Sequence, residues 1–152
     1  MSKMVKGNIP LVSAKKFDNG YKDFVKDNGK EVYPQNILTL NNDGDGGAGI
    51  SYYQPSKMML DTHVTALIPR FSNANKYVLL FFSCCITKQR EKFGHGYSLN
   101  NGRINSFRIT LPIKENGDIY YEYMEMFVKI SIQKMYEKYF QFFKNNMIGV
   151  DD

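Results

Sequence analysis

The sequence predicts an α+β fold, with a strand-rich, twisted-sheet body that contains one internal helix and precedes a long C-terminal helix. Three observations predict this class. Short apolar segments alternate with turn residues through the first half of the chain. Residues 75–92 then place apolar side chains at helical spacing, and residues 119–146 do so without a break. We expect a strand-rich domain over 1–118 and a helical domain over 119–152.

The expected strands are short apolar segments bounded by glycine, proline or asparagine. A hairpin signal, Asp18-Asn19-Gly20, lies inside the segment Phe17–Phe24. Asn41–Gly49 is polar and glycine-rich, which predicts a loop. The other expected strands are Ile9–Val12, Ile37–Leu40, Ile50–Tyr53, His63–Ile68 and Ile104–Ile113.

Two segments have helical periodicity. In Asn75–Lys92 the apolar row runs from Tyr77 through Leu80 and Phe81, and we expect Cys84 and Cys85 to be small buried residues on that helix. The second helix, from Ile119 to about Asn146, has one long apolar row with alternating steps of three and four. This C-terminal row consists of Tyr121, Met124, Val128, Ile132, Met135, Tyr139 and Phe142.

The charge is unevenly distributed. The 152 residues are 43% hydrophobic and 23% charged, enough for a real core, with 20 Lys+Arg against 15 Asp+Glu for a net +5. Up to Thr110 there are 15 basic and 8 acidic residues, or +7, and beyond it 5 and 7, or −2. A basic body suggests a polyanionic partner.

Several protein classes are excluded on composition. The apolar run Tyr77–Ile86 is too short to cross a bilayer, and the first residues contain no apolar stretch typical of a signal peptide. Adjacent Cys84 and Cys85 do not form an ordinary disulfide staple. We therefore expect a cytoplasmic, reduced protein with no membrane segment.

Two motifs in the glycine-rich segment resemble a dinucleotide-binding motif and a calcium-binding loop, but each lacks a feature that its function requires. Gly44–Gly49 matches G-x-G-x-x-G, but a strand-like segment ending in Pro55 follows it, where a dinucleotide site needs a helix. Asn41, Asp43 and Asp45 alternate as in a calcium loop, yet Tyr52 stands where the bidentate glutamate belongs. A flexible or tightly turned loop is the better interpretation.

Catalytic constellations are missing from the sequence. No acidic residue stands two positions before a lysine, as in many nucleases, and no Asn-Pro-Pro-aromatic or Asp-Pro-Pro-aromatic run is present. Adjacent cysteines with His63 and His95 are a poor zinc or nucleophile set. We expect no enzyme activity, no metal and no cofactor.

Polar, aromatic and basic side chains instead gather in three turns. Asn and Arg can read base edges, while Lys and hydroxyl groups hold phosphates. Ordinary solvated loops would have the same composition, so both interpretations stay open. The three groups are Lys15, Lys16, Asn19, Tyr21 and Lys22; Asn41, Asn42 and Asp43; and Lys88, Arg90, Lys92, His95, Tyr97, Asn100, Asn101 and Arg103.

The order of these segments resembles the target recognition domain of the DNA-specificity subunits of type I restriction-modification systems. The resemblance covers almost the whole chain, and Glu115–Ile119 with Tyr123-Met124 resembles the passage into that family's helix. The matching phrases are Gly7–Lys15, Asn19-Gly20, Ile37–Gly44, Tyr53–Pro55, His63–Leu67, Lys92–Leu99, Arg103-Ile104 and Ile109–Pro112.

The resemblance implies a non-catalytic domain that reads one half of a split double-stranded DNA target, beside methyltransferase and restriction subunits. On that basis the glycine-rich loop allows close approach of the backbone to another surface. The expected DNA-binding residues, from the resemblance and the basic turns together, are Ser13, Lys15, Lys16, Asn19, Lys22, Asn41, Asn42, Asp43, His63, Lys92, Tyr97 and Arg103. His63 could equally be structural, since it opens an apolar strand.

Complete subunits of that family have two recognition domains and two helical spacers, whereas this chain has one of each and begins late. It resembles a half-length or truncated member. We expect a homodimer paired through the C-terminal row, with folding back of the helix on its own sheet as the alternative. The competing function is a protein-interaction module that docks on the methyltransferase without reading DNA. A free-standing nuclease is disfavoured because the carboxylate-x-Lys pairing of many nucleases is missing.

Overall fold

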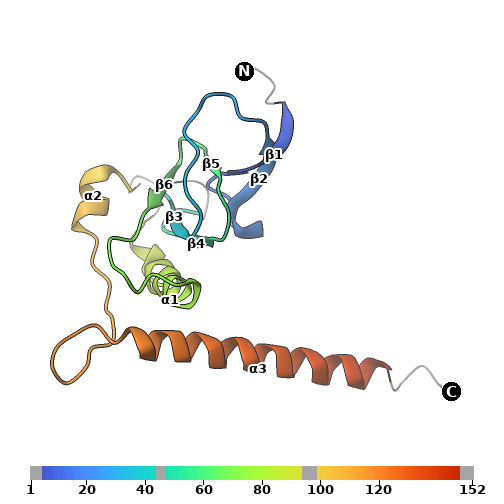
Figure 1. Cartoon of the computed structure of the whole chain (residues 1–152), viewed down its shortest axis with the longest axis vertical. Helices are drawn as coiled ribbons and strands as arrows, with labels where there is room; N and C mark the ends of the chain where they lie inside the picture. The colour runs from blue at the N-terminus through green and yellow to red at the C-terminus, as the bar shows by residue number, and fades with distance from the viewer. Residues whose placement is uncertain (1–4, 44–46, 94–98, 148–152) are drawn as a thin grey trace. The chain divides into compact units, whose positions relative to one another are not determined.

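The computed structural model describes residues 5–43, 47–93 and 99–147. The chain forms two compact units, Met1–Leu111 and Pro112–Asp152. In the described residues, the first unit contains strands β1 to β6 with helices α1 and α2, and the second contains α3 (Figure 1). The division precedes the boundary expected after residue 118, because the turn before α3 is closed by an Ile113–Ile119 bridge within the second unit.

One sheet has the order β2-β1-β5. Strand β1 (Lys6–Val12) pairs antiparallel with β2 (Tyr21–Val25) and parallel with the two-residue β5 (Met59–Leu60). The hairpin signal is confirmed, since the β1–β2 connection contains a 3₁₀ turn at Asp18–Gly20. Leu11, Val25 and Met59 form a small core cluster on this sheet.

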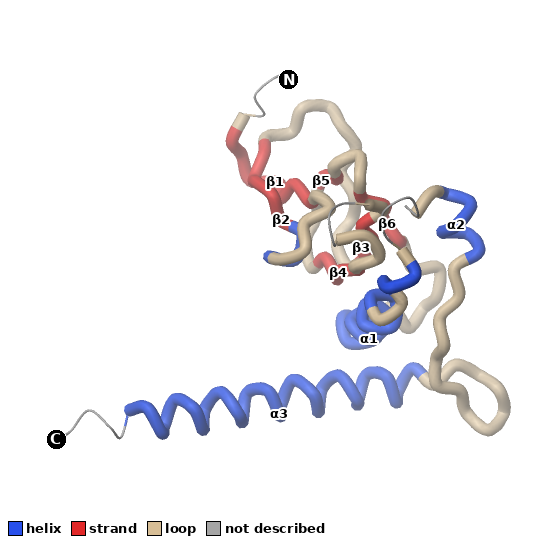
Figure 2. The backbone as a smooth tube through the Cα atoms, turned by 180° about the vertical axis from the view of Figure 1, so that it is seen from behind, coloured by secondary structure: helices blue, strands red, loops and turns tan. Residues whose placement is uncertain are grey.

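The other sheet has the order β4-β3-β6 and is antiparallel throughout. Its strands are β3 (Ile37–Asn41), β4 (Ser51–Gln54) and β6 (Val64–Leu67), and every residue of the central strand β3 is buried. Figure 2 shows the strands of both sheets gathered in one part of the first unit. The strands therefore form two small three-stranded sheets.

Helix α1 (Lys76–Thr87) packs against β4 and β3. It begins where the sequence predicts, since the Asn75 side chain accepts hydrogen bonds from the backbone N–H groups of Tyr77 and Val78. It ends earlier than expected, and Arg90–Lys92 form a separate 3₁₀ turn, η2. The core beside α1 joins Leu38, Leu40, Leu79, Ile86 and Leu99.

The buried face of α1 differs from the predicted row. Val78, Leu79, Ser83 and Ile86 are buried, whereas Cys84 is exposed and Cys85 is only half-buried, so the expectation for the two cysteines was wrong. The buried face centres on the apolar Val78, Leu79 and Ile86, and Ser83 is accommodated on it because its hydroxyl donates to the Ser51 carbonyl of β4 at 2.7 Å.

The predicted strand Ile104–Ile113 was wrong. Asn101–Ser106 form the short helix α2, because the Asn100 side chain accepts from the backbone N–H of Arg103 and caps a helical turn. The apolar residues that suggested a strand pack singly on the core beside α1, namely Ile104, Phe107 and Ile109.

The second unit is a turn followed by α3 (Tyr121–Met147), close to the predicted 119–146. The α+β class with a long C-terminal helix is therefore confirmed. In the described part of the chain, no helix is both long enough and apolar enough to span a membrane.

Candidate nucleic-acid interface

The first predicted group lies on the loop between β1 and β2, residues 13–20, which we call the basic loop. Its backbone turns sharply, with left-handed φ values of 56° at Asp18 and 53° at Asn19. The Lys15 ammonium donates to the Asp18 carboxylate at 2.7 Å and to the Tyr21 carbonyl at 2.8 Å. Lys15 therefore closes the loop on itself, while Lys16 is exposed at its tip.

Two side chains of the other sheet hold the basic loop by its carbonyl groups. The fully buried Asn41 donates through Nδ2 to the Lys15 carbonyl at 3.0 Å. The Tyr52 hydroxyl donates to the Lys16 carbonyl at 2.6 Å, and burial raises the pKa of Tyr52, so the phenol keeps its proton and remains a donor. The predicted residue Asn41 is thus a support for Lys15 and Lys16.

A third support is a network of amide side chains around Gln54. The fully buried Gln54 donates through Nε2 to the Asn19 carbonyl at 3.2 Å and to the Thr39 hydroxyl at 3.1 Å. The Asn19 side chain in turn donates through Nδ2 to the neighbouring Tyr53 carbonyl at 3.0 Å. Every side-chain contact of Asn19 therefore points into the protein, and its left-handed backbone is fixed from both sides.

Gly47 and Gly49, the described glycines of the glycine-rich segment, lie against the basic loop and the 3₁₀ turn η2 respectively. A Cβ on Gly47 would lie 2.9 Å from the Ala14 carbonyl oxygen. A Cβ on Gly49, whose φ is +76°, would lie 2.9 Å from the Arg90 Cα. The glycines thus permit a close backbone approach, but to other segments of this chain. A strand, β4, follows them, which agrees with the rejection of the dinucleotide motif.

The second predicted group lies beside β6. Asp43 and His63 form an ion pair at 2.9 Å, and the hydrogen bond and charge of Asp43 hold the pKa of His63 above its ordinary value. Asn42 accepts a hydrogen bond from the Thr65 hydroxyl at 2.8 Å, and its carbonyl accepts the Leu99 backbone N–H at 2.7 Å. These contacts bring the two predicted asparagine and histidine segments together.

Lys22 connects the first group to the second. Its ammonium donates to the Asp61 carboxylate at 3.1 Å, two residues before His63. Partial burial alone would raise the pKa of Asp61, but the bonds from Lys22 and from the Thr62 backbone N–H together hold it below its ordinary value. Asp61 is therefore ionised at neutral pH.

The described members of the third group lie in and around η2 and α2, whereas His95 and Tyr97 lie outside the described residues. Lys92 donates to the Gln89 carboxamide oxygen at 2.7 Å, and Gln89 donates through Nε2 to the Arg108 carbonyl at 2.9 Å. A shallow hollow is lined by these three side chains together with Phe93, Arg103, Ser106 and Phe107. Its ionisable lining is entirely basic, which suits an anion such as a phosphate.

The predicted DNA-binding residues therefore divide by exposure. Lys16, Lys22, His63 and Lys92 are exposed, and Lys15, Asn19, Asn42, Asp43 and Arg103 are half-buried. Ser13 and Asn41 are buried, so they support the surface instead of contacting a partner. Tyr97 lies outside the described residues.

Sequence reasoning missed the supports Tyr52 and Gln54 and the hollow residues Gln89 and Arg108. The phrase Tyr53-Gln54-Pro55 contains the one available signal, a long amide at the end of an apolar strand. Nothing in the sequence pairs that amide with Asn19, because their contact joins residues 35 positions apart.

Metal ligands do not gather in the described residues, where no group of three or more His, Cys, Asp or Glu side chains could hold an ion.

The seven members of the C-terminal row lie on α3, and Met135, Tyr139 and Phe142 are exposed.

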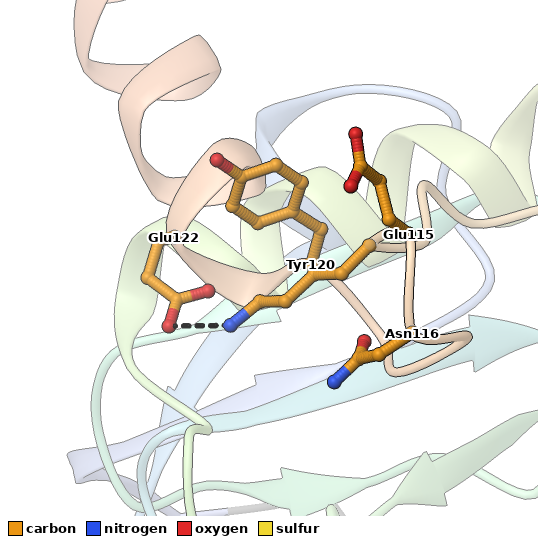
Figure 3. Close-up of a pocket in the computed structure, with 5 residues that line it drawn as sticks. Glu115, Asn116, Tyr120 and Glu122 are labelled. Carbon is orange, nitrogen blue, oxygen red and sulfur yellow. Dashed lines mark hydrogen bonds and ion pairs between the residues drawn. The ribbon is translucent and has the colours of Figure 1, made fainter.

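A separate hollow lies at the start of α3 (Figure 3). Lys114 donates to Glu122 at 3.0 Å, and its ammonium lies 5.4 Å from the centroid of the Tyr120 ring. A hydrogen bond from the backbone N–H of Glu122 itself and the Lys114 contact hold the pKa of the Glu122 carboxyl below its ordinary value. The contact between Lys114 and Glu122 therefore fastens the turn before α3 to the start of the helix.

A crystal structure of a type I restriction-modification system S subunit from M. genitalium is similar in fold, with a TM-score of 0.51 at 16% identity over 96% of this chain and 37% of that one. Residues 2–138 match the family described as "Type I restriction modification DNA specificity domain". The chain belongs to that family.

A curated relative is also similar in sequence. The specificity subunit S.BcgI of a type II restriction enzyme from Heyndrickxia coagulans is 32% identical over 125 residues, which cover 82% of this chain and 36% of that protein. The chain thus spans little more than a third of the length of each relative.

Proposed function

We propose that this chain reads the base sequence of double-stranded DNA as a non-catalytic specificity module of a restriction-modification system in the cytoplasm. Membership of the DNA specificity domain family over residues 2–138 carries the proposal. The +7 charge of residues 1–110, calculated from 15 basic and 8 acidic side chains, supports it, because phosphate contacts dominate the affinity of DNA-binding proteins.

The three groups take different parts in this proposal. Lys16, Lys22 and Lys92 contact phosphates and set the register on the duplex. Arg103 and Asn42 read base edges, the former suiting guanine and the latter adenine. Asp43 and His63 form one paired unit beside them. Ser13, Asn19 and Asn41 hold the basic loop in place, and Lys15 closes it.

Selection from a randomised pool of duplexes tests the proposal, followed by anisotropy titration of the enriched duplex. We expect one split or half-site sequence to be enriched. Arg103→Ala should lower affinity about fivefold to a hundredfold and relax the preference at one position. Lys16→Ala should weaken all sequences equally and reduce the salt slope by about one. Failure of the full chain to bind duplex at low salt, alone and with a methylating subunit, contradicts the proposal.

We also propose that α3 assembles the chain with a second copy and with the methyltransferase and restriction subunits. The exposed apolar side chains Met135, Tyr139 and Phe142 support it. Light scattering coupled to size exclusion should give twice the 17.6 kDa chain mass. Tyr139→Lys with Phe142→Lys should give a monomer. A monomeric wild-type chain contradicts pairing.

The competing function is protein interaction without DNA reading. The exposed apolar surface of α3 favours it as well. Capture of a methylating subunit by a chain that binds no duplex at any salt concentration would support it, and enrichment of a DNA sequence would exclude it.

A further inference from the structure

Phe17 is the most exposed large hydrophobic side chain of the described residues, with 67% of its surface accessible. It lies on the basic loop, immediately before the 3₁₀ turn Asp18–Gly20. Its backbone is extended, with φ −130° and ψ 178°, so it requires no strain of its own. The ring is therefore presented outward by an ordinary conformation.

The backbone that carries this ring is held on both sides. The carbonyl of Lys16 accepts the Tyr52 hydroxyl at 2.6 Å, and the carbonyl of Phe17 accepts the Gly20 backbone N–H at 3.1 Å. The next residues are fixed by Gln54 and Asn19. A ring on so constrained a loop loses little conformational entropy when it binds a partner, which is the condition for an efficient anchor.

Within the described residues, one uncompensated cation lies beside the ring. The Lys16 ammonium lies 5.7 Å from the ring centroid, whereas Lys15 is already paired with the Asp18 carboxylate at 2.7 Å. An apolar protein partner would have to desolvate Lys16. Duplex DNA instead offers an anionic phosphate to Lys16 and an apolar base stack to the ring, in the same arrangement.

We propose that Phe17 inserts between base pairs of the bound duplex, as an apolar wedge that unstacks one step while Lys16 contacts the neighbouring phosphate. This inference rests on the proposed DNA-reading function. It adds a mode of recognition, since a wedge selects easily unstacked steps such as TA and CA/TG through their deformability.

The test uses the full chain and a fluorescent duplex that carries the sequence enriched by the wild type. Phe17→Ala should weaken binding about tenfold, the usual scale of ring–base stacking, and leave the salt slope unchanged. Phe17→Leu should retain most of the affinity, because an aliphatic wedge also fits. Lys16→Ala should reduce the salt slope by about one. The control, Phe24→Ala, removes another exposed ring, on β2, and should not alter binding.

A second readout separates insertion from other contacts of the ring. With donor and acceptor dyes on the two duplex ends, wild type and Phe17→Leu should shorten the end-to-end distance, and Phe17→Ala should not. Equal binding and equal bending by wild type and Phe17→Ala would overturn the wedge alone and leave the proposed function standing. Enrichment of no duplex by the wild type would overturn both. Matching thermal unfolding of the variants shows that the exposed position does not affect folding.

Discussion

Gln54 is fully buried, and its side-chain amide contacts both Asn19 and Thr39. Gln54→Leu leaves the Asn19 carbonyl and the Thr39 hydroxyl without that donor, so we expect the free energy of unfolding to fall by about 1–3 kcal/mol. Urea denaturation measures it. Gln133→Leu is the control, because its amide contacts only Glu137 on the exposed surface of α3 and should change stability by less than about 0.5 kcal/mol. Equal losses would contradict the role of burial.

His63 gives a pH-dependent contact. Asp43 raises the pKa of His63 above its ordinary 6.5, so the imidazolium–carboxylate pair is complete below that value and is lost as pH rises through the raised pKa. An NMR titration of the His63 ring should therefore give a midpoint above 6.5, and Asp43→Asn should lower it. A midpoint unaffected by Asp43→Asn would show that the pair does not form in solution.

At the residue level, the turn signal was predictable, and helix caps and side-chain supports were not. Asp18-Asn19-Gly20 acts within three positions, so its pattern is visible in the sequence. The row through Cys84 suggested a buried face, yet Cys84 is exposed and Ser83 is buried instead, with its hydroxyl bonded to the Ser51 carbonyl. A polar contact across 32 positions leaves no periodic signal in the sequence.

Among the elements, the glycine turn at 47–49 allows a direct test. Gly29 and Gly49 both have left-handed φ, +77° and +76°, but only a Cβ on Gly49 meets other atoms within 4 Å. Gly29→Ala should cost about 1 kcal/mol for the backbone conformation. Gly49→Ala should cost a further 1–3 kcal/mol or so, because its Cβ would press on Arg90 in η2. Thermal or urea unfolding of the two variants measures the difference.

Elements with a clear period were predicted well, and those without one were not. The long row on α3 and the buried β3 have unambiguous patterns. The segment 104–113 has alternating apolar residues but becomes α2 and coil, because the Asn100 cap and separate packing sites for Phe107 and Ile109 outweigh strand propensity. The parallel pairing of β1 with β5 joins distant segments, and no local signal indicates it.

Across the whole molecule, the two units differ in charge, since residues 1–110 carry a net +7 and the remaining residues a net −2. Two double variants test this asymmetry. One combines Lys16→Glu with Lys22→Glu, and the other combines Lys134→Glu with Lys138→Glu. Each double variant lowers the net charge of +5 by four. If residues 1–110 carry the phosphate contacts, the first pair should lower duplex affinity more than about tenfold at low salt, and the second should change it little. Anisotropy titration of both variants at the same ionic strength makes the comparison. Equal losses would indicate that net charge alone drives binding.

The predictable part of the interface is its position along the chain, and the unpredictable part is which residues can reach a partner. The three polar turns were identified from composition, and contacts such as Lys22–Asp61 and Asn42–Leu99 join them across the surface. Burial of Asn41 and the inward contacts of Asn19 follow from the fold alone, because both side chains support the basic loop from within.

Strand β1 meets its two partners at very different separations along the chain. A single loop leads from β1 to β2, whereas β5 follows only after β3 and β4, so that Leu11 pairs with Met59. Closing the longer loop costs more conformational entropy and slows folding. We therefore expect the β1–β2 hairpin to form first with one edge of β1 unpaired, and an unpaired edge accepts strands from other molecules. Refolding yield should consequently fall as protein concentration rises, through an exposed edge that β5 later covers at Leu11 and Val12.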